Sequence, residues 1–341
     1  MTSSSTRAVK YSVIVPAFNA EATLPLCLDA LSRQTISEEM YEILVVDDGS
    51  SDGTAKVAQQ FKIRYFYQTN QGPAAARNLG AEAAAGEIIL FTDADCIPAA
   101  DWLEQMISPF ADPAVIGAKG AYATKQKKLI ARFVQIEFED RYDLLLQSRC
   151  IDMIDTYSAA FRKDVFLKIG SFDRNFPKAN NEDTELSYRL SAARYKMRFN
   201  RKALVLHHHP DELLTYLRVK FWRAYWRMIV YRRFPKKAIK DTYTPISLKM
   251  QTSLMALSLP LLLLAPVSSA ALWLVAVLWS IIILSTASFT LKALAKDKKV
   301  GLIAPGVIFL RSMVFAAGSL LGIARSFFFP PLRQVKTENL N

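Results

Sequence analysis

Two carboxylates one residue apart, Asp93 and Asp95, follow a short apolar run and could bind a metal ion. The run Ile88-Ile89-Leu90 directly precedes this turn and is typical of a buried strand. Paired carboxylates at the end of a buried strand are costly unless a cation meets them there. A hard divalent cation that also binds phosphate oxygens, Mg²⁺ or Mn²⁺, meets that need. Acidic turns after strands are common, so the interpretation of this pair as a metal site depends on the neighbouring segments.

Three more polar segments follow predicted strands, and helices are predicted between them. The strands are predicted at 11–15, 43–46, 64–67 and 87–91, and the helices at 21–34, 54–61 and 73–85. This alternation predicts an α/β fold with a mostly parallel sheet flanked by helices. Ligands bind such sheets at the carboxyl ends of the strands. The polar segments found there are Pro16–Asn19, Asp47–Thr54 and Asn70–Asn78.

Each polar segment alone is also an ordinary turn or helix cap. The sequence contains no Gly-x-Gly-x-x-Gly and no Gly-Lys-Ser/Thr loop. Dinucleotide oxidoreductases and P-loop NTPases are therefore disfavoured, because those motifs hold their phosphates.

Taken together, in this order and spacing, the segments resemble glycosyltransferase family 2. The resemblance extends over about 11–210 and implies the GT-A nucleotide-sugar fold. It includes a stretch similar to the acceptor-side Glu-Asp motif of the family, and another that often precedes that motif. The segments that carry it are Val13–Asn19, Glu42–Thr54, Asn70–Gly80, Asp93/Asp95, Phe161–Asp173 and Asn181–Leu190.

The resemblance implies a role for each site residue. Asp183 would be the catalytic base, with Glu182 as its neighbour on the acceptor side. Asp95 would bind the metal ion on the diphosphate, and Asp93 would contact the ribose or the metal. The remaining donor-binding residues would be Pro16, Phe18 and Glu21 around the nucleoside, Asp48 at the base, and Gly72 and Arg77 near the rest of the donor.

The chemistry supports the assignment of Asp183. Displacing a nucleoside diphosphate from an anomeric carbon requires charge stabilisation on the leaving group, which a metal held by Asp95 supplies. It also requires removal of a proton from the acceptor hydroxyl, for which one carboxylate suffices. Direct displacement inverts the anomeric configuration. Acids at 182–183 also suit a helix N-terminus, and both roles can hold at once.

A histidine cluster, His207-His208-His209-Pro210, follows the strand-like Ala203–Leu206. In an extended chain His207 and His209 would point the same way. The resemblance suggests a histidine near the metal or the diphosphate, and His207 is the first choice. A solvated or interfacial histidine cluster is the alternative.

The C-terminal third predicts a membrane region. No charged residue occurs from Gln251 to Leu291, and a helix needs about 20 residues to cross a bilayer. Two spans are therefore predicted at about 251–267 and 270–291, with a buried soluble hairpin as the alternative. A third apolar segment, 300–324, has Arg311 near its middle. A span, a re-entrant hairpin and an interfacial helix all remain open for it.

Basic residues are concentrated directly before the first predicted span. Segment 194–240 holds 14 lysines and arginines against two acids, which accounts for the net charge of +12. A basic block beside membrane spans favours an anionic membrane surface over nucleic acid as partner. The loop 292–299 after the second span is also basic. Both flanks are therefore predicted on the cytoplasmic side.

The predicted organisation has five parts. These are a polar tail at 1–10, a GT-A domain at 11–210, a basic and aromatic interfacial region at 211–247, a membrane region at 248–325 and a polar tail at 326–341. The helix predicted at 213–234 suits the headgroup zone. The amphipathic segment 129–146 could lie on the membrane or pack on the domain.

These observations predict an inverting glycosyltransferase anchored in the cytoplasmic (inner) membrane, with its catalytic domain facing the cytoplasm. It would use Mg²⁺ or Mn²⁺ to transfer one sugar from a nucleotide-diphosphate donor to a hydroxyl of a lipid-linked glycan or glycolipid, for cell-envelope polysaccharide or glycolipid synthesis. The Gln-x-x-Arg-Trp motif of processive members is absent before the spans, which disfavours polymer synthesis. The alternatives are a polyprenyl-phosphate sugar synthase and a non-catalytic scaffold of an envelope-assembly complex. The sequence leaves the oligomeric state open.

Overall fold

The computed structural model describes residues 9–176 and 180–328, which form two compact units. We call the first the sheet unit; it holds the described residues up to Ala123 and the segment Leu145–His208. The second, the helical unit, holds Thr124–Leu144 and the described residues from His209 onward. Most of the two tails predicted at 1–10 and 326–341 lies outside the described residues.

The sheet unit is built on one mixed, mostly parallel sheet. Among the described residues it has eight strands in the order β3-β2-β1-β4-β7-β6-β8-β5. The first half is parallel, while β7 runs antiparallel to both β4 and β6. The strands are β1 Tyr11–Ala17, β2 Tyr41–Asp47, β3 Arg64–Tyr67, β4 Ile88–Phe91, β5 Cys96–Pro98, β6 Val115–Ala123, β7 Ala159–Arg162 and β8 Lys196–His207.

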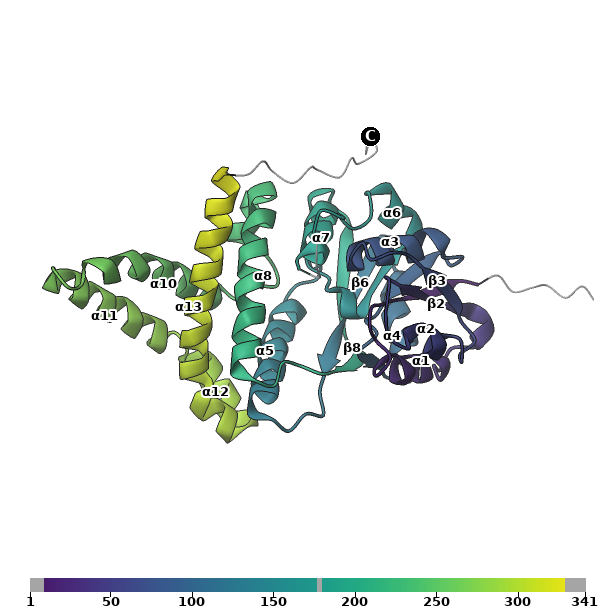
Figure 1. Cartoon of the computed structure of the whole chain (residues 1–341), viewed down its shortest axis with the longest axis horizontal. Coiled ribbons are helices and arrows are strands. Elements are labelled where there is room, and N and C mark those ends of the chain that lie inside the picture. Colours follow the sequence, from purple (N-terminus) through teal and green to yellow (C-terminus); the bar gives the residue numbers. More distant parts are fainter. Residues whose placement is uncertain (1–8, 177–179, 329–341) are drawn as a thin grey trace, which may run out of the picture. The chain divides into compact units, whose positions relative to one another are not determined.

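Helices of the sheet unit flank this sheet (Figure 1). They are α1 Leu24–Ser32, α2 Thr54–Ala58, α3 Pro73–Ala83, α4 Trp102–Ile107, α6 Lys163–Lys168 and α7 Glu182–Ala192. The predicted α/β fold class is confirmed. The predicted helix at 21–34 begins later, at Leu24, because residues 19–21 bond to the loop after β2.

A close contact fixes α3 on the sheet. A Cβ on Gly80 of α3 would lie 2.4 Å from Cγ2 of Ile14 on β1. Ile14 is fully buried, as are its neighbours on the central strands. Glycine therefore lets α3 approach the sheet closely, which sets the position of Arg77 one turn earlier on the same helix.

The helical unit contains the long apolar helices. Its members are α5 Leu129–Leu146, α8 Leu213–Arg233, α9 Pro235–Ile239, α10 Ile246–Leu264, α11 Ser269–Leu284, α12 Ala287–Lys296 and α13 Lys298–Phe328. The last two residues of α5 fall within the sheet unit. Three segments are long and apolar enough to cross a membrane: Ile246–Leu264, Ser269–Lys296 and Lys298–Arg325.

Helices α10 and α11 form a hairpin (Figure 1). Gln251 donates to Ser285 Oγ at 2.9 Å, and the Trp279 indole donates to Ser258 Oγ at 3.0 Å. These bonds satisfy polar side chains inside an otherwise apolar hairpin, as a membrane setting requires. The turn lies between Leu264 and Ser269, where proline and serines interrupt the leucines.

Candidate functional site

The loops after β1 and β2 interlock at the carboxyl edge of the sheet. The Asn19 amide donates to Ser50 Oγ at 2.9 Å, and Ser51 donates back to Asn19 Oδ1 at 2.9 Å. The Gly53 amide donates to Glu21 Oε2, also at 2.9 Å. Glu21, predicted to line the nucleoside pocket, therefore braces the second loop.

Phe18 and Pro16, predicted at the same pocket, lie at the end of β1. Pro16 is half-buried in the strand, whereas Phe18 is 52% exposed. An exposed aromatic ring at a sheet edge is free to stack on a planar ligand such as a nucleobase.

Asp48 is buried and orders the loop that precedes α3. Its Oδ1 accepts from Gln68 Nε2 at 2.6 Å and from the Gln71 amide at 2.9 Å, and its Oδ2 accepts from the Gly72 amide at 2.8 Å. Gly72 has a φ of +89°, which favours glycine. Both carboxylate oxygens thus hold the loop that precedes α3 in place. The predicted contact of Asp48 with a base would be made beside these hydrogen bonds.

Arg77 of α3 joins two carboxylates that are far apart in sequence. Its guanidinium is 3% exposed and donates to Asp93 Oδ1 at 2.8 Å and to Glu182 Oε1 at 2.9 Å. Burial opposes the charge, but Asp93 and Glu182 raise the pKa of Arg77 above its ordinary value. The fixed cation therefore links the end of β4 to the start of α7.

Glu182 and Asp183 open α7, as the sequence indicated. Glu182 is 2% exposed, and burial together with the charge of Asp183 raises its pKa to about 7, although Arg77 works against the rise. Asp183 is half-buried, and its Oδ1 accepts from the Thr184 amide at 2.6 Å. The pair thus divides into a buried carboxyl group bound to Arg77 and a more accessible carboxylate beside it.

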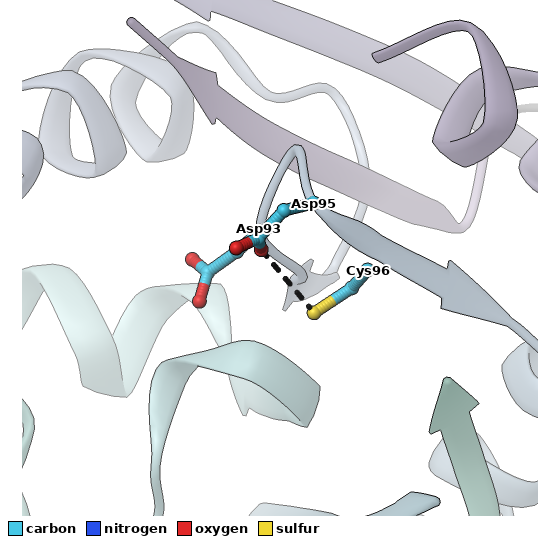
Figure 2. Close-up of side chains that lie close together, drawn as sticks. All are labelled: Asp93, Asp95 and Cys96. Carbon is cyan, nitrogen blue, oxygen red and sulfur yellow. Dashed lines mark hydrogen bonds between the residues drawn. The ribbon is translucent and has the colours of Figure 1, made fainter. Parts of the chain in front are cut away.

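Asp93, Asp95 and Cys96 form the group of described residues that could hold a metal ion (Figure 2). Their ligand atoms lie within 4.8 Å of one another, and the Asp93 and Asp95 side chains are 30% and 49% exposed. Burial raises the pKa of the Cys96 thiol well above its ordinary value. The thiol therefore donates to Asp95 Oδ1, as the dashed line in Figure 2 marks, rather than acting as a thiolate ligand.

The structure brings His207 to this acidic group. Strand β8 pairs antiparallel with β5 so that His207 faces Cys96 in register. Its Nε2 lies 3.5 Å from Asp95 Oδ2. Burial tends to raise the pKa of Asp95, but the hydrogen bond and charge of His207 hold it below its ordinary value. The two carboxylates are donors that suit Mn²⁺ or Mg²⁺, and the His207 imidazole lies beside one of them.

The three histidines differ in position. β8 ends at His207, His208 is exposed, and His209 is buried in the helical unit with its Nε2 2.9 Å from Gln135 Oε1. Of the three, His207 joins the acidic group.

A buried lysine on β6, which is connected to His207 through two tyrosine rings, was not identified from the sequence. Lys119 of β6 is fully buried, forms an ion pair with Asp155 and lies 4.8 Å from the ring centroid of Tyr157. Tyr157 stacks on Tyr122, which stacks on His207 with centroids 4.5 Å apart. A single charge inside the apolar strand at 115–123 was the signal that could have revealed it.

Comparisons with known proteins show what the chain is similar to. Residues 12–170 match the sequence model of Glycosyl transferase family 2. Glycosyltransferase AglE of Haloferax volcanii is 30% identical over 210 residues, which cover 58% of this chain and 66% of AglE. Validoxylamine A glucosyltransferase of Streptomyces hygroscopicus subsp. limoneus is 28% identical over 226 residues, covering 56% and 50%. The chain thus spans about half to two thirds of the length of these relatives.

A solved structure resembles the chain over most of its length. It is the mannosyltransferase PcManGT from Pyrobaculum calidifontis, in complex with GDP-Man and Mn²⁺. The TM-score is 0.56 at 19% identity, and the likeness covers 95% of this chain and 88% of that one. At this identity the likeness shows the fold, which is GT-A-like.

Proposed function

The chain belongs to glycosyltransferase family 2 through residues 12–170, and from this premise we propose that it transfers one sugar, with inversion, to a membrane-associated acceptor. The donor is a nucleotide-diphosphate sugar, and the acceptor group is a hydroxyl of a lipid-linked glycan or a glycolipid. The acceptor class is supported by the three helices of the same chain that are long and apolar enough to cross a membrane. The product would serve cell-envelope polysaccharide or glycolipid synthesis.

The observation that carries the proposal is the bridge made by Arg77. It contacts Asp93, one of the candidate metal ligands, and Glu182, beside Asp183. Transfer needs a group that stabilises the leaving diphosphate close to a group that accepts a proton. One buried guanidinium that contacts both carboxylate pairs supports their assignment to a single reaction.

In the proposed reaction the bond between the anomeric carbon and the donor diphosphate breaks as the acceptor oxygen attacks from the opposite face. The carboxylate of Asp183 takes the proton of the acceptor hydroxyl. Asp93, Asp95 and His207 would hold the divalent ion, which supplies Lewis-acid stabilisation of the diphosphate when bound. The exposed ring of Phe18 would stack on the nucleoside.

The proposed location is the cytoplasmic face of the inner membrane. Helix α8 and the segment after it carry Arg218, Arg223, Arg232, Lys236 and Lys240 with exposed side chains. Cations next to apolar helices favour an anionic leaflet and the cytoplasmic side.

The test is transfer of radiolabelled sugar from a panel of UDP- and GDP-sugars, with Mn²⁺, to lipids in nanodiscs that contain host membrane extract. Wild type is compared with Asp183→Asn and with Asp164→Asn, which removes an exposed acid from the first turn of α6. We expect organic-phase label from one donor, retained in Asp164→Asn and reduced by about 10²-fold or more in Asp183→Asn.

Other outcomes identify the alternatives. Label that persists in Asp183→Asn would indicate an acceptor that is already ionised, as in a polyprenyl-phosphate sugar synthase. Absence of both transfer and Mn²⁺-dependent nucleotide binding in calorimetry would leave the non-catalytic scaffold.

A further inference from the structure

Arg311 lies in the middle of α13 and is bound by side chains of the helical unit. It is 6% exposed, and it donates to Glu137 Oε1 at 2.7 Å and to Gln251 Oε1 at 2.9 Å. Lys220 of α8 donates to Glu137 Oε2 at 2.6 Å. Burial tends to raise the pKa of Glu137, but the charges of Lys220, Arg141 and Arg311 lower it below its ordinary value. The middle of α13 is therefore attached to α5 and α8 by a buried ionic cluster.

The start of α13 is attached to the same helix, α5. Arg132 of α5 donates to Asp297 at 2.7 Å, one residue before α13 begins. Asp297 and Arg311 are 14 positions apart, which corresponds to about 21 Å of helix at about 1.5 Å per residue. Half of the hydrocarbon thickness is only about 15 Å.

This spacing argues against α13 standing upright in a bilayer. If Asp297 lay at the surface of an upright helix, Arg311 and its partner Glu137 would lie beyond the bilayer centre. α5 cannot follow, because it also carries Glu139, Asp140 and Asp143. Asp140 accepts from Lys292 of α12 at 2.8 Å, and Glu139 pairs with Lys296 of α12. Charges in this number are costly in hydrocarbon.

α13 also packs closely along α8, and the two helices lie side by side (Figure 1). A Cβ on Gly318 would lie 2.3 Å from the Phe221 carbonyl oxygen, and one on Gly322 would lie 2.5 Å from that of Tyr225. Small residues four apart permit such contact between helix backbones. The two pairs advance together along both chains, so the helices are parallel.

The charges of α8 therefore determine the depth of α13. Arg218, Arg223 and Arg232 are exposed and lie along most of α8. A helix with cations at such intervals belongs to the headgroup zone, where its charges meet lipid phosphates. Because α13 contacts α8 backbone to backbone, its C-terminal half lies at the same depth.

The face of α13 away from this packing is apolar. Within the apolar window of α13, 44% is buried in the protein, against 22% in each of the other two candidate spans. After the exposed lysines of its first turn, the exposed residues of α13 are apolar or small and recur at helical spacing along one broad stripe: Leu302, Gly306, Leu310, Ala317, Leu320, Leu321, Ile323, Phe327 and Phe328. One apolar stripe opposite a charged, buried side is typical of a helix in the membrane interface.

We propose that α13 lies in the plane of the membrane interface, bound to α5 and α8, with its apolar stripe against the acyl chains of one leaflet. Only the α10–α11 hairpin enters the hydrocarbon. The C-terminal end of α13 then stays on the same side of the membrane as α8, along which it packs. The proposal does not depend on the acceptor or on the reaction.

Depth measurement by spin labelling in nanodiscs tests this directly. Nitroxides are attached at single cysteines replacing Leu302, Leu310 or Leu321 on the α13 stripe, and Leu272 or Ile283 on α11 as the matched control, since all five are exposed. The background carries Cys150→Ser, because Cys150 is the exposed native cysteine. Accessibility to oxygen and to a nickel chelate reports the depth.

We expect the three α13 labels at equal depth, within about 5 Å. The two α11 labels should differ by up to about 16 Å, as 11 residues of inclined helix require. A difference of about 12 Å between positions 302 and 310 would overturn the assignment of α13, because an upright helix predicts it. Equal depths along α11 would overturn the assignment of the hairpin.

The side of the membrane gives an independent readout. In the Cys150→Ser background, a cysteine added after Asn341 is labelled with an impermeant maleimide in oriented vesicles, and a cysteine replacing exposed Thr215 of α8 reports the side of that helix. Labelling of both from the same side supports the proposal, and labelling from opposite sides contradicts it.

Discussion

Arg77 is the residue on which the candidate site depends most directly. A buried cation with two carboxylate partners is a strong positional constraint, because removing it leaves buried charge without compensation. Its two partners lie 16 and 105 residues away in sequence. The contacts of Arg77 with Asp93 and Glu182 therefore stabilise the fold and align α7 with the end of β4.

Replacing Arg77 with methionine should destabilise the protein by about 3–5 kcal/mol, as loss of one partner of a buried ion pair does. Unfolding in urea at constant detergent measures the change. The matched control is Arg33→Met, which breaks an exposed pair with Asp29 at side-chain exposures of 75% and 49% and should change stability little.

The double variant Arg77→Met/Glu182→Gln separates the ion pair from simple packing. Glutamine removes the buried ionisable carboxyl group that methionine leaves without its cation, so part of the lost stability should return. If the double variant lost the sum of the two single effects, the two side chains would be energetically independent.

Glu182 gives the site a predicted dependence on pH. Its folded-state pKa of about 7 lies above the ordinary 4.5. Between these values the folded state keeps a proton that the unfolded state releases, so this group's contribution to stability falls as pH rises through that window. Glu182→Gln has no such group and does not lose this stability. The Tm of the variant should therefore rise relative to that of wild type as the pH is raised from about 5 to about 7.5.

Thermal unfolding at a series of pH values makes the measurement. Asp164→Asn, at an exposed acid of α6, shows the effect of removing a surface charge alone. Parallel Tm curves for wild type and Glu182→Gln would contradict the prediction.

At the scale of elements, the pattern of apolar residues predicted the strands and helices whose formation depends on neighbouring residues. The strands expected at 11–15, 43–46, 64–67 and 87–91 correspond to β1 to β4, because each is an apolar run that the sheet buries. α3 follows its proline and alanine-rich pattern. The match of residues 12–170 confirms the family, and the structural likeness confirms the fold.

Contacts between segments far apart in the chain could not be predicted from the sequence. Nothing near His207 indicates that β8 lies beside β5, yet this register is what brings the imidazole to Asp95. Likewise Arg311 and Glu137 are 174 positions apart, so the midpoint charge of α13 had no visible partner. The roles of the site residues remain predictions, since position alone does not test them.

The packing of α13 on α8 predicts a contrast between two glycines of one helix. Gly318→Leu should destabilise the protein by about 1–3 kcal/mol or more, because a side chain there meets the Phe221 carbonyl and overpacks the interface. Gly306→Leu is the matched control, since a Cβ added there would have no atom within 4 Å. Unfolding in the same detergent compares the two, and equal losses would argue against the backbone contact.

For the whole molecule, charge and apolar surface are distributed unevenly along the chain. Segment 194–240 carries the entire net charge of +12, and the candidate spans follow it. A chain arranged in this way attracts anionic lipid at one region while its hairpin enters the bilayer. Exposed arginines near such a surface contribute about 1 kcal/mol each.

The last prediction concerns retention of anionic lipid by the whole protein. Native mass spectrometry counts phosphatidylglycerol bound to protein released from detergent, with phosphatidylcholine as the competitor. Wild type should retain phosphatidylglycerol preferentially, and the triple variant Arg218→Gln/Arg223→Gln/Arg232→Gln should lose most of this preference. The corresponding lysine variant keeps the charge and should keep the preference, because the attraction is electrostatic; added salt should weaken it in both. A glutamine variant that binds phosphatidylglycerol as wild type does would place the membrane-facing charge elsewhere on the chain, and α8 would then no longer determine the depth of α13.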